Sequence, residues 1–267
     1  MSRQFTRSSN QRLDCGSNAI HNTSNITVAA WAYADSFVSG DYNYIISREE
    51  SNSPYQGFTL RQYNLTPHFV IAVGVTEYTA SGTLPSTGVW HHWAGTYDGE
   101  TVTLWIDGAS SGTNTSPSGN MRAAAGGTKT YIGDSYAWTP RFWNGKIAEV
   151  AIWNTALGSV DIQALNRGIS PLCIRSNNLV SYWPIKGAYS PELDLVGRQH
   201  GTLSNNPVSA LHSNMIPTGF FDFQTLSGMS PRESPPLVDG RRLRRTLATP
   251  TSVAATTNFL TLLGVGA

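Results

Sequence analysis

The chain has 267 residues and a formal net charge of +1. Only 13% of its residues are Asp, Glu, Lys or Arg, which excludes a strongly basic nucleic-acid-binding protein, and a content of 10% aromatic residues excludes a disordered chain. With 8 Trp, 11 Tyr, 9 Phe and 25 Gly, the composition indicates an all-β protein of short strands and tight turns.

The sequence predicts neither a membrane span nor a cleaved leader. No apolar run approaches the ~18–20 residues that span a bilayer, and the N-terminal sequence MSRQFTRSSNQRLDCG lacks the apolar stretch of a secretory signal. Cys15 and Cys173 are too few for a disulfide scaffold or a cysteine zinc site. They form either one disulfide, if the first strand lies beside the segment after residue 170, or two buried thiols, which a reducing compartment favours.

Short β-like runs recur up to about residue 170, after a polar arm predicted at residues 1–12. Gly, Asn, Asp and Pro separate these runs, as is typical of strands joined by turns. The predicted strands are residues 26–33, 42–47, 57–61, 69–73, 130–133 and 145–153.

The clearest local signal is a pair of strands within residues 90–108, WHHWAGTYDGETVTLWIDG. Two Asp-Gly dipeptides, at 98–99 and 107–108, favour the positive φ angles of hairpin turns. Alternation in the second strand separates an apolar face from the opposite face. The first face carries Val102, Leu104 and Ile106, and the other carries Thr103 and Trp105.

One short helix is predicted after the strands. Ser159 is the expected N-cap, Ile162 and Leu165 share one face, and Gly168 ends the helix before Pro171. A single helix among many strands predicts a β-sandwich and not alternating βαβ units.

The pattern changes past residue 208. Residues 13–208 are predicted to form the folded body, and residues 209–267 an extended anchoring tail, because the tail mixes prolines, a basic cluster and an apolar end without any periodicity. Four arginines could bind nucleic acid, but docking into an acidic groove of a neighbouring subunit is preferred. The candidate anchor residues are Arg241, Arg242, Arg244, Arg245, Phe259, Leu260, Leu262 and Leu263.

The hairpin at 90–108, Y-I-G-D at 131–134 and NGKIAEVAIWNTAL at 144–157 resemble the laminin-G-like branch of the concanavalin A-like lectin/glucanase superfamily. LVSYWPIKG and DLVGRQHGTLSNNP, within 179–207, resemble a segment often attached to such domains in bacterial and phage surface proteins. The resemblance implies an all-β jelly-roll sandwich of two antiparallel sheets, roughly 10 Å apart, with one short helix and the C-terminal arm. Members of the family bind glycans, bind proteins or serve as passive structural modules, so the fold does not fix the function.

The loop at residues 134–144 is the candidate ligand site. It follows a strand, and its aromatic rings could stack on sugars while polar side chains form hydrogen bonds. The alternative is that Phe142 and Trp143 plug the edge of the sandwich. The candidate carbohydrate- or partner-binding residues are Asp134, Tyr136, Trp138, Arg141 and Trp143.

No cofactor is expected to be required, although the resemblance makes calcium a candidate ion. Calcium prefers hard oxygen ligands from loops, and the loop carboxylates that could cluster at one end of the sandwich are Asp35, Asp41, Asp98 and Asp134. The alternative is that all of them are solvated turn residues. His91 and His92 are adjacent on a strand and point to opposite faces, so they do not easily share a metal.

The catalytic pattern of glucanases on this fold is incomplete. The family carries Glu-x-Asp-x-x-Glu on one strand, and here Glu192 and Asp194 begin that pattern while Gly197 replaces the second glutamate. A glycosidase needs two carboxylates across a cleft. The chain is therefore predicted not to be an enzyme.

These observations predict a non-catalytic structural or adhesion protein. The favoured hypothesis is a virion component, such as a phage decoration, head-fibre or tail protein, assembled in the host cytoplasm and bound to capsid or tail subunits. The alternative is a glycan-binding lectin module at a bacterial cell surface or outside the cell, and a glycoside hydrolase ranks last. Surface glycans are candidate partners; membranes and nucleic acid are not.

Overall fold

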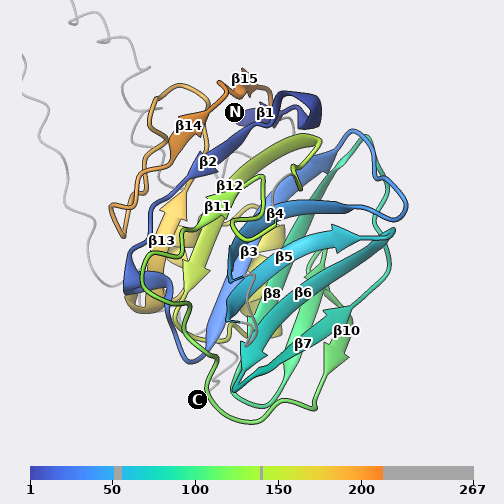
Figure 1. Ribbon diagram of the computed structural model, residues 1–267, viewed down its shortest axis with the longest axis vertical. Helices are drawn as coiled ribbons and strands as arrows, with labels where there is room; N and C mark the ends of the chain where they lie inside the picture. Colours follow the sequence, from blue (N-terminus) through green and yellow to red (C-terminus); the bar gives the residue numbers. More distant parts are fainter. Residues whose placement is uncertain (51–55, 139–140, 213–267) are drawn as a thin grey trace, which may run out of the picture. The chain divides into compact units, whose positions relative to one another are not determined.

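A computed structural model describes residues 1–50, 56–138 and 141–212 of the chain. It confirms the predicted fold class: two antiparallel sheets pack face to face, and one α-helix lies among the described residues. Figure 1 shows strands β4 to β7 in one layer and β3, β8 and β12 in the layer behind it. The anchor residues predicted between Arg241 and Leu263 lie outside the described residues, so the anchoring tail stays a prediction.

The first sheet, called sheet A, has the strand order β10-β9-β8-β3-β12-β1-β15, and β13 pairs with the second half of β12. Its strands are β1 (Ser2–Phe5), β3 (Ile26–Ala34), β8 (Trp90–Tyr97), β9 (Val102–Ile106), β10 (Ala109–Asn114), β12 (Gly145–Trp153), β13 (Leu179–Trp183) and β15 (Val208–Ala210).

The second sheet, called sheet B, has the order β14-β2-β11-β4-β5-β6-β7. Its strands are β2 (Arg12–Asp14), β4 (Tyr42–Glu49), β5 (Gly57–Tyr63), β6 (Thr66–Val73), β7 (Thr76–Ser81), β11 (Tyr131–Ile132) and β14 (Thr202–Ser204). Short 3-10 helices, η1 (Arg7–Ser9), η2 (Ala19–His21), η3 (Pro171–Cys173) and η4 (Ser176–Asn178), connect the strands.

Every strand predicted from the sequence is confirmed, and so is the strand pair at 90–108. Asp107 and Gly108 have φ angles of 51° and 80° and form the two-residue turn between β9 and β10. Such a turn needs positive φ at both positions to match the strand twist. The alternation along β9 is confirmed too, because Leu104 is buried between the sheets while Trp105 packs against the outer cluster of sheet A.

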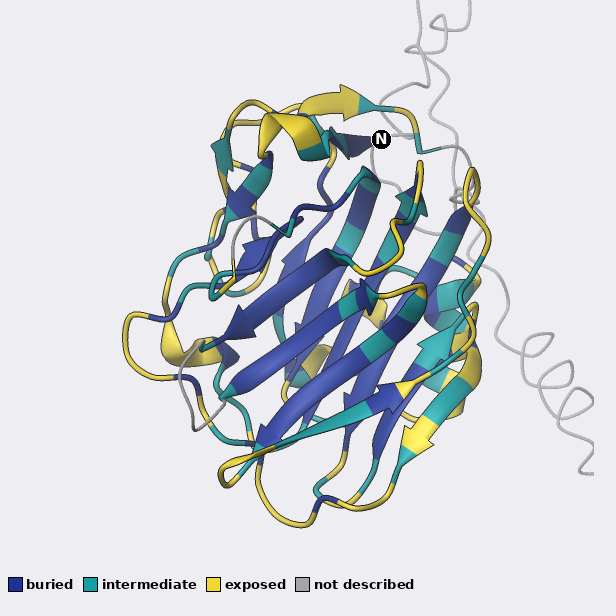
Figure 2. Cartoon of the chain, turned by 45° about the vertical axis from the view of Figure 1, so that its right-hand side comes forward, coloured by how far each residue is buried: buried dark blue, intermediate teal, exposed yellow. Residues whose placement is uncertain are grey.

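The core lies between the two sheets and is filled by alternate residues of each strand. Val28 and Ala30 of β3 face this core, whereas Ala29 faces the outer side of sheet A. The sheets approach closely at Gly95, where a Cβ atom would lie 2.1 Å from the ring of Phe69 in β6. Figure 2 shows the central strands dark blue along most of their length, with exposed residues in the loops and in edge strands such as β10 and β15.

Helix α1 (Ser159–Asn166) covers the outer face of sheet A. Its buried residues Ile162 and Leu165 join a second apolar cluster that also contains Trp153. The predicted N-cap is corrected: Gly158 takes that position in extended conformation and makes no side-chain capping bond. Gly168, with φ of 85°, ends the helix as predicted. Among the described residues, no helix has the length and apolar character needed to cross a membrane.

The structure corrects the prediction that residues 1–12 form a polar arm. Strand β1 pairs with both β12 and β15, so the N-terminus is part of sheet A. Phe5 is fully buried in the core, and the buried guanidinium of Arg3 forms an ion pair with Glu192 at 2.6 Å. The sequence SRQF gives little local sign of a strand, because its stabilising partners come from the far end of the domain.

The two cysteines neither pair nor share a buried environment. Both are free thiols, and Cys15 lies in the core whereas Cys173 is exposed. Burial, with a smaller contribution from nearby carboxylates, raises the pKa of the Cys15 thiol well above its ordinary value.

His21 connects the two sheets. Its ring nitrogens hydrogen-bond to Thr130 Oγ1, next to sheet B, and to Ser181 Oγ on β13 of sheet A, both at 2.8 Å. The ring also packs edge-on against Trp183. Burial lowers the pKa of His21 to about 3, helped by the positive charge of Arg48. The folded protein therefore holds a neutral imidazole here.

This buried imidazole predicts acid sensitivity. Below the ordinary histidine pKa of 6.5, His21 binds a proton in the unfolded chain but stays neutral in the folded protein. The free energy of unfolding therefore falls as the pH drops from 6.5 towards 3. His21→Gln should be less stable than the wild type at pH 7, and the difference should narrow at lower pH. Urea unfolding of both proteins between pH 4 and 7 measures this, and a difference independent of pH would contradict the assignment.

Candidate functional site

The candidate loop connects β11 to β12, and its described residues after Asp134 bond first to the outer face of sheet B. The backbone N–H of Tyr136 donates to Ser47 Oγ of β4 at 3.1 Å, and Ser135 Oγ donates to Glu49 Oε1 at 2.7 Å. Both acceptors lie on the side of β4 that faces away from the core cluster. These two bonds fix residues 135 and 136 to β4.

Three aromatic side chains form an accessible surface beside this loop. The rings of Tyr42 and Tyr63 stack with centroids 4.0 Å apart, because these residues are register partners of β4 and β5. Trp138 contributes the most exposed Trp side chain among the described residues, at 40%. We call Tyr42, Tyr63 and Trp138 the aromatic platform. The guanidinium of Arg141 lies 3.8 Å from the Tyr42 ring centroid and 5.2 Å from that of Trp138.

A buried polar network supports Arg141 from below. The hydroxyl oxygen of Tyr44 accepts hydrogen bonds from Arg141 Nη1 at 3.1 Å and from Arg61 Nη1 at 2.7 Å. Arg61 lies 3.6 Å from Glu49. Burial raises the pKa values of both Tyr44 and Glu49, while the arginines oppose that rise. The network positions the Arg141 guanidinium against the platform.

The structure separates the predicted loop residues into two groups. Trp138 and Arg141 lie at the platform, and half-buried Tyr136 packs edge-on against Tyr131 at 5.5 Å. Asp134 is fully buried and accepts from Arg12 Nη1 and from the N–H of Arg141, both at 3.1 Å. Its role is to hold the loop.

Trp143 belongs to the core, which corrects its place among the ligand-binding candidates. Its side chain is 1% exposed and packs edge-on against Trp93. Its Nε1–H donates to the carbonyl of Tyr33 at 3.2 Å. The alternative interpretation of the sequence, in which Phe142 and Trp143 plug the sandwich, describes their position correctly.

An open hollow of about 520 Å³ adjoins the platform. Arg7 and Asp41 line it and form an ion pair, and Arg7 Nη1 also donates to the carbonyl of Tyr42 at 3.0 Å. Sequence reasoning placed Tyr42 in a strand but missed its role, along with that of Tyr63. The sequence signal that could have indicated an aromatic surface on this strand was the pair Tyr42 and Tyr44.

The predicted calcium ligands do not converge. Asp35 accepts from Gln4 Nε2 at 2.8 Å, Asp41 pairs with Arg7, and Asp134 pairs with Arg12. Asp98 accepts the N–H groups of two following residues in its own turn. Across residues 1–50, 56–138 and 141–212 no group of three His, Cys, Asp or Glu residues is placed to hold an ion. The donors named from the sequence therefore do not fit a shared calcium site.

The two carboxylates of the incomplete glucanase pattern are buried and already engaged. Glu192 Oε1 accepts from Arg3 Nε at 2.6 Å and from the N–H of Gly187 at 2.9 Å. Asp194 is 3% exposed and accepts backbone N–H groups from Tyr182 and from its own turn. A catalytic carboxyl group must reach the substrate, and these two groups fix the 185–201 segment instead.

A Ser-His-Asp relay occurs on the surface of sheet A, at the start of β8 and the end of β9. Ser86 Oγ lies 3.1 Å from His91 Nε2, and His91 Nδ1 lies 2.6 Å from Asp107 Oδ2. The order of these bonds matches a hydrolase triad. However, Asp107 sits in the β9–β10 turn, and its other oxygen accepts the N–H of His92 at 2.9 Å. The relay therefore also joins three neighbouring segments, which is a structural role.

We expect the structural role to dominate. Asp107→Ala removes the acceptor for both histidines and should lower stability by about 1–3 kcal/mol, whereas Ser86→Ala should leave the melting temperature unchanged because Ser86 is exposed. Asp107→Asn keeps the residue preference of the turn and one acceptor oxygen, so its melting temperature should lie between those of Asp107→Ala and Ser86→Ala. Thermal unfolding measures all three variants. Labelling of Ser86 by a fluorophosphonate probe would contradict this assignment.

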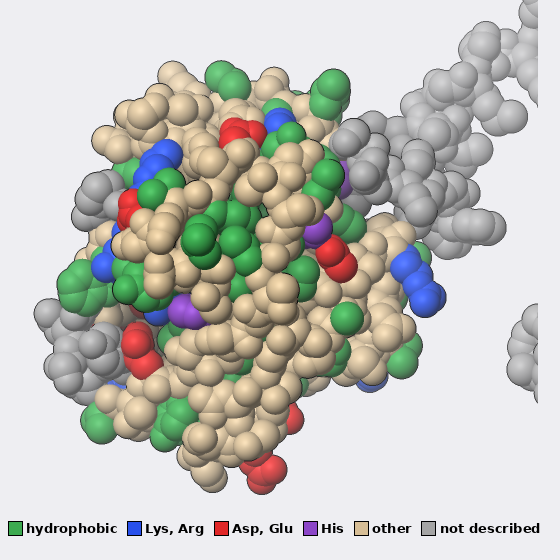
Figure 3. All heavy atoms as spheres, turned by 90° about the vertical axis from the view of Figure 1, so that its right-hand side faces the viewer, with side chains coloured by type: hydrophobic (Ala, Val, Ile, Leu, Met, Phe, Trp, Pro, Cys, Tyr) green, Lys and Arg blue, Asp and Glu red, His purple; other side chains and the backbone are tan. Residues whose placement is uncertain are grey.

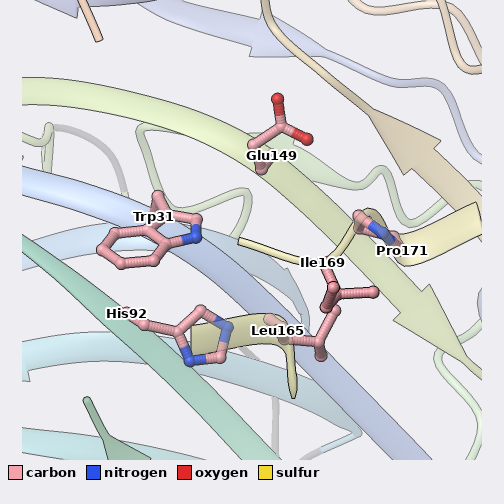
Figure 4. A pocket seen from close by; sticks show the side chains of 7 residues that line it. Trp31, His92, Glu149, Leu165, Ile169 and Pro171 are labelled. Atoms are coloured by element: carbon pink, nitrogen blue, oxygen red, sulfur yellow. The ribbon is translucent and has the colours of Figure 1, made fainter. Parts of the chain in front are cut away.

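A small pocket under helix α1 is shown in Figure 4. Trp31 and His92 of sheet A, Glu149 of the β12 bulge and Leu165 of the helix line it. Burial raises the pKa of Glu149 to about 7, against the effect of a hydrogen bond from the Tyr182 hydroxyl. The pocket has about 10 Å³, room for one water molecule, so it is too small for a sugar.

The two packed antiparallel sheets define a jelly-roll sandwich. The sequence profile of the concanavalin A-like lectin/glucanases superfamily, in its laminin-G-like form, matches residues 7–163. The chain therefore belongs to this superfamily. No curated protein sequence matches the chain.

Solved structures with the same architecture include a Bacteroides ovatus protein provisionally named a carbohydrate-binding protein. It is 21% identical, with a TM-score of 0.55 over 76% of this chain and 57% of that protein, so the chain spans little more than half its length. A heptameric SAP-like pentraxin of Limulus polyphemus is 17% identical, with a TM-score of 0.46 over 60% of this chain and 77% of the pentraxin. The carbohydrate-binding module of a Ruminococcus gnavus sialidase, bound to α2,3-sialyllactose, is 14% identical, with a TM-score of 0.47 over 55% of this chain and 85% of the module.

Proposed function

We propose that this chain is a non-catalytic carbohydrate-binding module whose ligand lies on the aromatic platform. The observation that carries the proposal is the accessible set of Tyr42, Tyr63 and Trp138 around the Arg141 guanidinium. Membership of the concanavalin A-like lectin/glucanases superfamily, whose name covers carbohydrate-recognising proteins, supports it. Extracellular or cell-surface display suits such a ligand.

The platform has the chemistry that sugars require. Aromatic rings with a polar end offer apolar faces to C–H groups while keeping contact with water. Arg141 and the polar hollow beside Tyr42 supply hydrogen-bond donors and acceptors at the edge of those rings. Only 13% of the residues are charged, and Figure 3 shows one side of the molecule on which a group of hydrophobic side chains lies near the centre, with acidic and basic side chains scattered around it.

The hypothesis of a virion component rests on a different part of the chain. Its anchor residues, among them Arg241 and Leu263, lie outside the described residues. The function proposed here concerns the sandwich alone, and a displayed sandwich could bind glycans in either setting.

A matched pair of tryptophans tests the site. Trp138→Ala should abolish glycan binding with little change in melting temperature, because the side chain is 40% exposed. Trp143→Ala should instead lower the free energy of unfolding by about 3–5 kcal/mol, since it empties a buried site in the core. A glycan array, run with calcium and with a chelator, and thermal unfolding give the two readouts.

Two results would contradict the proposal. One is an array without any binding above background for the wild-type protein. The other is wild-type binding retained by Trp138→Ala and by Tyr63→Ala, since both variants remove platform rings. A large stability loss in Trp138→Ala would indicate a packing role for this side chain.

A further inference from the structure

We propose that the site selects anionic saccharides, bearing carboxylate or sulfate groups, and that Arg141 binds the anionic group. The inference rests on the proposed function and adds the chemical class of the ligand. Arg141 differs from the arginines around it in its charged partners.

The neighbouring arginines each have a carboxylate partner. Arg7 pairs with Asp41, Arg12 pairs with Asp134 at 3.1 Å, and Arg61 lies 3.6 Å from Glu49. Arg141 forms no ion pair with any residue in the described part of the chain, and its guanidinium donates to the neutral hydroxyl of Tyr44. One positive charge at the platform is therefore left for a ligand.

Asp41 is the described carboxylate that could neutralise Arg141 from the side. Burial raises the pKa of Asp41, but hydrogen bonds from the N–H of Tyr42 and from Arg7 outweigh it, and the Arg141 charge adds to the fall. The oxygens of Asp41 are taken by these two donors. The Asp41 carboxylate therefore attracts the Arg141 guanidinium but forms its ion pair with Arg7.

The placement of Arg141 favours a planar, two-pronged contact. The Tyr42 ring, 3.8 Å from the guanidinium, and the Tyr44 hydroxyl hold the group before any ligand arrives. A held guanidinium presents parallel N–H donors that match the oxygens of a carboxylate or sulfate. Trp138, with its ring centroid 5.2 Å away, is placed to stack on the sugar that carries the anion.

The decisive experiment uses a glycan array containing neutral, uronic- or sialic-acid and sulfated saccharides, followed by calorimetric titration of the strongest binder. Wild-type protein should bind the anionic glycans, with an affinity that falls as sodium chloride is raised. Arg141→Gln should lose about tenfold or more in affinity, and Arg141→Lys should recover only part of it. The carboxylated and sulfated arms identify which anion is used.

Arg167→Gln is the matched control, because it removes the same charge from an exposed position at the end of helix α1, on the other sheet. It should bind like the wild type. Melting temperatures show whether each variant is folded. If Arg141→Gln does not fold, the affinity of Arg141→Lys relative to the wild type and the salt dependence of wild-type binding test the Arg141 contact instead.

The outcomes separate this inference from the proposed function. Binding of neutral glycans that Trp138→Ala abolishes and Arg141→Gln leaves intact would overturn the anionic selection and keep the carbohydrate site. An array without any binding would overturn both. Equal loss in Arg141→Gln and Arg167→Gln would show that net charge, and not the Arg141 contact, drives binding.

Discussion

The central strands of sheet A, β3, β8 and β12, are mostly buried on both faces, and this constraint decides where a ligand can bind. Their inner face packs against sheet B, and their outer face is covered by helix α1 and the segment that follows. Ala29, Ala94 and Ala151 lie under that cover, where small side chains allow the helix to approach the strands closely. The pocket beneath the helix, lined by Trp31 and Glu149, holds little more than a water molecule.

No helix among the described residues covers the outer face of sheet B, and its buried residues are stabilised by polar contacts instead. Its outer face carries the buried groups Glu49, Arg61 and Tyr44, which pair with one another instead of being covered by an apolar layer. Buried polar groups are costly unless they are bonded. The 134–144 loop completes this network through Ser135 and Arg141, and in doing so it brings Trp138 and Arg141 to the stacked rings of Tyr42 and Tyr63. The candidate site is thus a consequence of how the sheet satisfies its buried polar groups.

Local signals in the sequence were enough for most of the fold. The Asp107-Gly108 turn, the alternation in β9 and the glycine that ends helix α1 each act within a few residues, and each was predicted. The strands that were not predicted are the short or peripheral ones, β1, β2, β7, β10, β13, β14 and β15. Strand β1 is an example, since its partners β12 and β15 are distant in sequence.

The candidate site was only half predictable for the same reason. Trp138 and Trp143 stand five positions apart in one loop, and only the packing against Trp93 shows that the second is in the core. The stack of Tyr42 on Tyr63 depends on the register of β4 and β5, which the sequence does not specify directly. Pairing of Asp41 and Asp134 with arginines likewise required the fold.

The most direct test is to locate a bound saccharide on the folded chain. Backbone amide chemical shifts, followed by NMR while the strongest array ligand is added, should change at Tyr42, Tyr63, Trp138 and Arg141. Amides of helix α1 and of β13 should stay unchanged, since both lie on sheet A. Shifts confined to the helix or to the Trp31 pocket, with the platform unaffected, would contradict the account.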